Sequence, residues 1–261
     1  MNIKPSADKL PIIQSLWIGD SLSVMEQLSI RSFQSKGHEF HLYAYNDLDN
    51  VPEGTILKDA NKIITKDKIF KYKDYDSYAG FANMFRYKLL LEKGSWWVDT
   101  DVICLLPLDL ENEHVFASSV YKQLNAQGEP KHGIENCIIK APAESEIMEY
   151  CYLEASRSNP NELRWGQTGP TLLHNAINKF GFQKYVERPN TFCPISSEDW
   201  GRCINGSIRV LWRDKMKMTI YRSKTVHLWN ELWRRYGVDK ASLFPKRSIY
   251  EQFKRRYLGI I

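Results

Sequence analysis

The stretch from residue 83 to residue 101 constrains the fold of this chain more than any other. Phe81, Phe85 and Leu89 recur at helical spacing, and Gly94 stands where such a helix needs a left-handed cap at its carboxyl end. A short apolar run with strand propensity follows and ends on two carboxylates. The pattern predicts a buried helix, a short buried strand and an acid pair at the end of that strand.

The acids are Asp99 and Asp101. On an extended chain, residues i and i+2 point to the same side, so both carboxylates can converge on one cation. Hard oxygen ligands suit Mg²⁺ or Mn²⁺, and these ions commonly bridge a carboxylate and a substrate phosphate. A helix packed ahead of a hydrophobic strand puts the acids at the carboxyl edge of a sheet, where open α/β folds bind ligands. We therefore predict a metal and phosphate site here.

The same stretch resembles the DXD-containing sugar transferases of glycosyltransferase family 32 and, more distantly, the glucosylating domains of large clostridial toxins. Their pattern is a small residue, Asp, two apolar residues, Arg, an apolar helix, two glycines, an aromatic strand and Asp-x-Asp. Here Asn83 replaces the first Asp, Arg86 matches the Arg, and Ser95 replaces the second glycine. The resemblance implies one GT-A-like α/β domain over residues 1–261, with a mixed, mainly parallel sheet flanked by helices.

The resemblance also implies roles for these residues. The reaction would move a hexose from a UDP-sugar, with retention of anomeric configuration. Asp101 would bridge the metal, Mn²⁺ or Mg²⁺, to the diphosphate, and Asp99 would bind the metal or the ribose. Arg86 lies three residues after Asn83 on the same helix face and would contact the donor sugar or diphosphate. Asn83 can hydrogen-bond a sugar hydroxyl but carries no charge.

The first strand is predicted over residues 11–19, and its Trp-Ile-Gly end matches the start of the same family. By resemblance, Trp17 stacks on the uracil of the donor, with Leu16 beside it in the nucleotide site. Stacking on a flat base contributes ~1–3 kcal/mol in nucleic-acid complexes. The alternative is that Trp17 is a core residue near a strand end.

Three later segments supply the remaining candidates. Asn136 enters a predicted strand that resembles the asparagine segment near the transferred sugar, or it is only a core-strand residue. Gly169 lies in a Thr-Gly-Pro turn ahead of a helix, where free N–H groups suit hydroxyls or phosphate. His227 is the candidate third metal ligand, unless it is structural, and Trp229 shares its face of a predicted strand at i+2 and would pack on the diphosphate or sugar.

Pattern and turn chemistry assign the other elements more coarsely. A strand at 40–45 after a helix at 21–35 predicts a βαβ start with a parallel sheet. The remaining expectations are a helix and loop in 56–73, strands at 102–107 (continuing the sheet) and 115–120, a surface loop and lid at 123–133, helices at 144–156 and 171–180, and edge strands at 207–210 and 219–221.

Charge is uneven along the chain. The net charge is +5, but residues 202–261 hold 15 Lys and Arg against 4 Asp and Glu, so residues 1–201 carry a net −6. We expect this basic segment to close the site over phosphate. Anionic lipid is a second partner and a solvated surface the alternative, whereas nucleic acid is disfavoured because no such motif is present. In residues 246–258, Ile249, Phe253 and Leu258 oppose a basic face, which predicts a membrane-surface helix or a terminal helix docked on its own domain.

Location and redox state follow from what the sequence lacks. No apolar run approaches the ~20 residues of a membrane span, and residues 1–10 lack a signal-peptide core. We expect a cytoplasmic protein, peripheral on the inner face of the membrane where it meets lipid. Five cysteines without a Cys-x-x-Cys pair predict neither a disulfide framework nor a zinc site.

The function predicted from these features is a metal-dependent hexosyltransferase acting on a glycan or lipid-linked acceptor in capsule or lipopolysaccharide synthesis. Two alternatives use the same residues differently. A metal-dependent nucleotidyltransferase would also need paired acids, but it would release pyrophosphate rather than UDP. A non-catalytic glycan-binding protein would need no metal pair and would not turn over UDP-sugars.

Overall fold

The computed structural model describes residues 10–124 and 127–260, and the statements below concern those residues. The strands are β1 (Ile13–Trp17), β2 (Phe40–Ala44), β3 (Ile56–Asp59), β4 (Ser95–Val98), β5 (Val102–Cys104), β6 (Val115–Leu124), β7 (Pro130–Ala141) and β8 (Thr225–His227). The α-helices are α1 (Val24–Gln34), α2 (Ala79–Lys93), α3 (Glu146–Arg157), α4 (Leu172–Phe180), α5 (Pro189–Phe192), α6 (Ile208–Ile220), α7 (Asn230–Arg235) and α8 (Ile249–Phe253). Shorter π-helical segments cover Gln167–Thr171 and Lys254–Leu258, and a 3-10 helix covers Ser197–Ile204.

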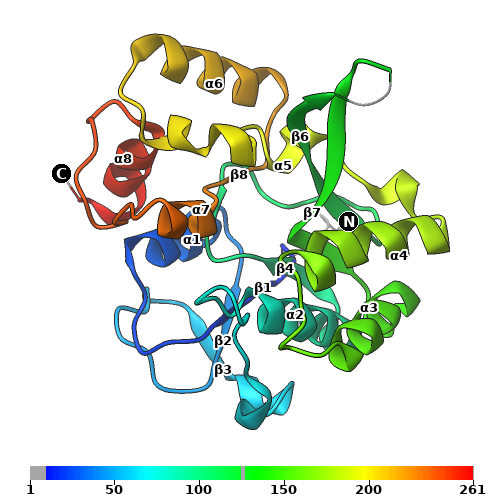
Figure 1. Cartoon of the computed structure of the whole chain (residues 1–261). Coiled ribbons are helices and arrows are strands. Elements are labelled where there is room, and N and C mark those ends of the chain that lie inside the picture. The colour runs from blue at the N-terminus through cyan, green and yellow to red at the C-terminus, as the bar shows by residue number, and fades with distance from the viewer. Residues whose placement is uncertain (1–9, 125–126, 261) are drawn as a thin grey trace, which may run out of the picture.

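Six strands form the main sheet, in the order β3-β2-β1-β4-β7-β6 (Figure 1). The first four of these run parallel, whereas β7 is antiparallel to β4 and β6 is antiparallel to β7. Parallel pairing of β1 with β2 through α1 confirms the predicted βαβ start. The fold is therefore the predicted one, a mixed, mainly parallel sheet flanked by helices.

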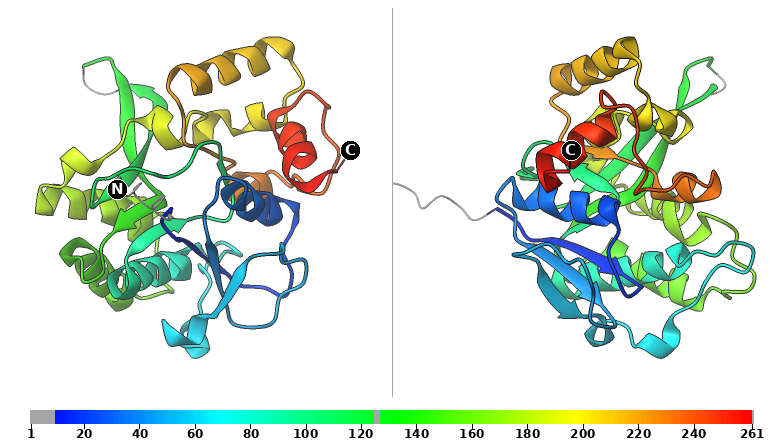
Figure 2. Two further views of the ribbon diagram at one scale, coloured as in Figure 1. Left: turned by 180° about the vertical axis from the view of Figure 1, so that it is seen from behind. Right: turned by 90° about the vertical axis from the view of Figure 1, so that its left-hand side faces the viewer.

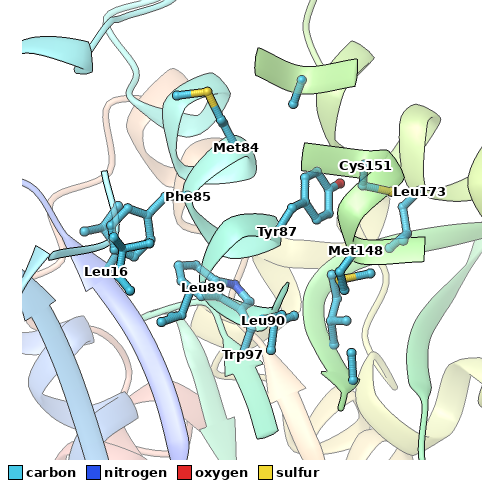
Figure 3. Close-up of a cluster of buried hydrophobic side chains, with 14 of the residues drawn as sticks. Leu16, Met84, Phe85, Tyr87, Leu89, Leu90, Trp97, Met148, Cys151 and Leu173 are labelled. Atoms are coloured by element: carbon cyan, nitrogen blue, oxygen red, sulfur yellow. The ribbon is translucent and has the colours of Figure 1, made fainter. Parts of the chain in front are cut away.

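Alternation along the strands divides the core between the two faces of the sheet. Leu16 and Trp97 belong to one face, and they pack with the buried sides of α2, α3 and α4. In Figure 3, Phe85 of α2 points toward Leu16, while Tyr87 points toward Cys151 of α3. The opposite face is covered by α1 and α5. Helices therefore cover both faces of the sheet (Figure 2).

A third apolar cluster forms around β5 and β8, which pair as a separate antiparallel ribbon. Ile103 of β5 and Val226 of β8 are fully buried there, together with Trp233 of α7. The neighbouring side chains come from α1, α6 and α8, so the last quarter of the chain closes over one end of the first helix (Figure 1).

Four local predictions were wrong or incomplete. The edge strands expected at 207–210 and 219–221 are the two ends of one helix, α6. Residues 102–107 do not continue the main sheet, because β5 pairs with β8 instead. The helix expected in 56–73 is absent, and that segment forms the edge strand β3 and two short 3-10 turns. The loop expected at 123–133 is mostly hairpin, since β6 reaches Leu124 and β7 begins at Pro130; residues 125–126 lie outside the described residues.

The C-terminal helix docks on its own domain. Ile249 and Phe253 are buried in the third cluster, and the Tyr257 hydroxyl donates to the Cys104 carbonyl at 3.2 Å. The apolar face expected to enter a membrane surface is therefore covered by protein. Among the described residues, every helix is too short or too polar to cross a membrane. The N-terminal segment used to predict location lies almost wholly outside the described residues.

Candidate active site

A cleft of about 510 Å³ opens at the carboxyl ends of β1 and β4. Leu16 and Trp17 line it from the end of β1, and Asp99 and Asp101 line it from the turn after β4. Residues 76–79, Ala82 and Arg86 line another side, and side chains between residues 230 and 240 complete the lining. Because β1 and β4 are adjacent parallel strands, their carboxyl ends deliver these residues to the same edge of the sheet.

The acid pair lies in a tight turn between β4 and β5, where the Val102 N–H donates to the Asp99 carbonyl at 3.1 Å. Asp99 Oδ1 accepts from the Trp97 indole N–H at 2.8 Å. Asp101 is more enclosed: its Oδ2 accepts from the Asn230 N–H at 2.7 Å and lies 3.2 Å from His227 Nε2. The turn and the start of α7 thus hold both carboxylates in fixed positions.

Asp99, Asp101 and His227 each present one ligand atom, and these atoms lie within 4.8 Å of one another. The Oδ1 atom of Asp101 is buried and has no hydrogen-bond partner among the described residues. A buried, unpartnered carboxylate oxygen is costly unless something positive occupies its neighbourhood. Two carboxylates and an imidazole are a donor set suited to Mn²⁺, so the residues fit a divalent cation.

The surroundings shift the pKa values of Asp99 and Asp101 in opposite directions. Burial raises the pKa of Asp99, against the opposing effect of the nearby Arg86 guanidinium. Burial also acts on Asp101, but the His227 ring and the Asn230 N–H outweigh it and hold the pKa of Asp101 below its ordinary value. The pKa of His227 lies well above its ordinary value because the Asp101 carboxylate overcomes the effect of burial. The surroundings thus favour the ionised form of Asp101 more strongly than that of Asp99.

Arg86 connects helix α2 to the acid turn. Its guanidinium lies 3.2 Å from Asp99 Oδ1, donates to the Asn136 carbonyl and covers the Trp97 ring at 4.9 Å from the ring centroid. The side chain is nearly buried, yet it contributes to the lining of the cleft. Its position adds fixed positive charge next to the acids, which favours an anionic ligand.

Behind Arg86 lies a buried amide network. Asn136 Nδ2 donates to Asn83 Oδ1 at 2.8 Å, and Asn83 Nδ2 donates to Thr168 Oγ1 at 3.4 Å. The Gly169 carbonyl accepts from the Tyr87 hydroxyl at 3.2 Å. A Cβ at Gly169 would stand 2.8 Å from Asn83 Nδ2, so only glycine fits between the two asparagines. The structure thus brings Asn83, Asn136 and Gly169 together next to Arg86, and these three residues do not themselves line the cleft.

Trp17 occupies the other end of the cleft. Its indole N–H donates to the Ser21 carbonyl at 3.0 Å, which fixes the ring, and the side chain is half-buried. Lys240 Nζ lies 5.9 Å from the ring centroid and pairs with Glu26 at 2.7 Å. Glu26 also closes a capping box with Ser23 at the start of α1. Lys240 therefore joins the C-terminal wall to the strand that carries Trp17.

Trp229 sits away from the cleft, behind His227. Its backbone is left-handed, with φ of 60°, so it does not continue β8. The ring centroids of His227 and Trp229 are 3.9 Å apart, and the indole N–H donates to the Ile195 carbonyl at 2.9 Å. This places Trp229 as a support of the His227 ring. Its predicted contact with diphosphate or sugar stays a prediction.

Several residues at this site were not found from the sequence. Trp97 had a signal, since it precedes Asp99 by two positions on the same strand face. Asn230 and Lys240 had none, because their roles depend on how residues 230–240 fold over the cleft. Cys137 and Cys193 form a second group with His227, again with ligand atoms within 4.8 Å, and their sulfurs are 3.9 Å apart. These cysteines come from distant segments, so no spacing motif could reveal them.

Comparison with known proteins gives no match to a protein-family model and no match among curated sequences. Similarity appears among solved structures. The bifunctional glycosyltransferase WbbM shares 12% identity at a TM-score of 0.50, over 98% of this chain and 50% of that one. The chain therefore spans about half the length of WbbM.

Two further solved structures are similar at lower scores. The PaToxG glycosyltransferase has 15% identity and a TM-score of 0.42, over 95% of this chain and 86% of that one. GlyE of Streptococcus pneumoniae, also described as a glycosyltransferase, has 11% identity and a TM-score of 0.46, over 94% and 60%. The fold of this chain is GT-A-like, as its strand order and the likeness to WbbM show.

Proposed function

We propose that this chain is a metal-dependent glycosyltransferase that moves a hexose from a UDP-sugar to a glycan or lipid-linked acceptor. One observation carries the proposal. Asp99 and Asp101 converge with His227, which lies more than 120 residues later in the sequence, beside a buried, unpartnered carboxylate oxygen, and both acids line the cleft of a GT-A-like fold. Such a group of ligands suits a stabilising divalent cation.

Asp99, Asp101 and His227 would hold Mn²⁺ or Mg²⁺ in this proposal. When bound, the ion offsets the negative charge that grows on the departing diphosphate. Arg86 adds a second, permanent positive charge next to Asp99 and orients the diphosphate. Sugar transfer passes through an oxocarbenium-like state, so stabilising the departing anion lowers the barrier to transfer.

The rest of the cleft would hold the remaining parts of the donor. Trp17 and Leu16 line the end furthest along β1, where the uracil would stack on the indole. Asn83, Asn136 and Gly169 would shape the wall nearest the hexose. Residues 202–261 would close the site, a proposal supported by the cleft wall between residues 230 and 240 and by the Lys240–Glu26 ion pair.

We also propose that the transfer retains the anomeric configuration and that it serves capsule or lipopolysaccharide synthesis. The support for both proposals is the resemblance to glycosyltransferase family 32.

The test is a screen of nucleotide sugars for UDP release in the presence of Mn²⁺, with pyrophosphate measured in parallel. The proposal expects UDP release with at least one UDP-hexose, its loss in EDTA and its return with added Mn²⁺. Release of pyrophosphate would identify a nucleotidyltransferase. Absence of turnover with every donor, in a protein that still binds glycans, would identify a glycan-binding module.

A further inference from the structure

Helix α6 presents an apolar stripe to solvent. Ile208, Trp212, Met216 and Ile220 follow one another at intervals of four residues and are 46%, 69%, 57% and 65% exposed. Residues i and i+4 lie on one helix face, so these side chains form a continuous strip along the whole helix. In Figures 1 and 2 the helix lies at the rim of the molecule in all three views.

The opposite side of α6 already has its partners. Leu211 is buried in the third apolar cluster, and Lys217 Nζ donates to the Pro194 carbonyl at 2.6 Å. Asp214 is 1% exposed and pairs with Arg202 of the preceding 3-10 helix. The helix is thus anchored by its inner side, and the outward strip leaves about half or more of each of its side chains open to solvent.

The charge around the strip has one sign. Arg209, Arg213 and Lys215 are exposed on α6, whereas its single acid, Asp214, is buried and paired. Lys215 also contacts Gln252 of α8, whose side-chain amide donates to the carbonyl of the exposed Arg247, so the basic rim continues toward the segment that precedes α8. An apolar strip bordered by cationic side chains is the pattern of a helix that lies in a lipid interface.

We propose that the outward face of α6 docks the protein on an anionic lipid surface. Trp212 and the aliphatic side chains would enter the boundary between headgroups and acyl chains, where indole rings are favoured. The basic side chains would stay at headgroup level, their stems along the apolar strip. The partner is a lipid surface rather than a second copy of the chain, because self-association through this face would bring two basic rims together.

The inference does not depend on the proposed glycosyl transfer. It also moves the membrane contact from the C-terminal helix, whose apolar face is buried, to α6. The end of α6 is separated by only four residues from β8, which carries His227. Docking through α6 would therefore hold the cleft close to the lipid surface.

The experiment is cosedimentation of the full chain with two kinds of vesicle. One kind contains phosphatidylcholine alone, and the other contains phosphatidylcholine mixed with the anionic lipid phosphatidylglycerol. Trp212→Glu is the test variant. Leu57→Glu is the matched control, because Leu57 is 45% exposed on β3, at the opposite end of the molecule from α6 in Figure 1. Thermal melting checks that both variants fold.

The wild-type chain should bind the anionic vesicles and not the neutral ones. Trp212→Glu should weaken that binding by at least tenfold, and Leu57→Glu should leave it unchanged. Equal binding by Trp212→Glu, or no binding by the wild type, would overturn the proposal. A wild-type dimer that Trp212→Glu converts to a monomer, seen by light scattering, would also overturn it by showing that a second copy covers the strip.

Discussion

Replacing Gly169 by alanine should damage both stability and donor binding. The new Cβ would stand 2.8 Å from Asn83 Nδ2 and 3.0 Å from Asn136 Nδ2, closer than carbon and nitrogen tolerate. Neither amide can swing aside freely, because each is buried and hydrogen-bonded within the network. The substitution must therefore break hydrogen bonds or displace the π-helical segment that carries Gly169.

The expected cost follows from those two routes. Breaking two buried hydrogen bonds costs about 2 kcal/mol, and overpacking a well-packed site costs a similar ~1–3 kcal/mol. For a chain of this size, a loss of about 2 kcal/mol lowers Tm by roughly 4–8 °C. If the asparagines shape the hexose site, KM for the donor should also rise several-fold.

Calorimetric melting and donor kinetics measure the two effects. Gly201→Ala is the matched control, because a Cβ at Gly201 meets nothing within 4 Å and its backbone is not left-handed. That control should keep the wild-type Tm and KM. A Gly169→Ala protein with the Tm and KM of the control would refute the reasoning about the amide network.

The other predictions concern three separate parts of the molecule. Trp17→Ala should weaken UDP binding by ~1–3 kcal/mol in calorimetry, and unchanged affinity would make Trp17 a core residue. His227→Ala should raise the Mn²⁺ concentration for half-maximal activity at least tenfold, more than it lowers Tm. Lys254→Met should cost about 3–5 kcal/mol by denaturant unfolding, because it leaves buried Glu251 without its partner at 2.6 Å. Arg256→Met, at an exposed neighbour, should change stability by less than about 0.5 kcal/mol.

The sequence was informative where a local pattern determines the structure. Helix α2, the strand β4 that leads into the acid pair and the βαβ start were all predicted, because apolar periodicity and glycine caps act within a few residues. The convergence of Asp99 and Asp101 was predicted for the same reason, although a turn rather than an extended strand brings it about. The proximity of His227 was predicted from the family resemblance, and the structure places it at the acid pair.

Prediction failed where partners lie far apart in sequence or where burial was misjudged. β5 leaves the main sheet to pair with β8. This pairing was missed because β8 lies more than a hundred residues later, beyond the reach of a local pattern. The two ends of α6 contain β-branched and aromatic residues, which favoured strands, but their exposure makes them a surface strip on a helix. The amphipathic tail was correctly seen as a helix, yet only tertiary packing decides that its apolar face is turned inward.

The central claim is that Asp99, Asp101 and His227 hold a cation that in turn holds the diphosphate of a UDP-sugar. Calorimetric titration of UDP into the wild-type chain, with Mn²⁺ or with EDTA, tests it most directly, and Asp101→Asn is the matched variant. We predict at least tenfold tighter UDP binding with Mn²⁺ than with EDTA for the wild type. We predict no such difference for Asp101→Asn. Equal UDP affinity in Mn²⁺ and EDTA for the wild-type chain would contradict the account.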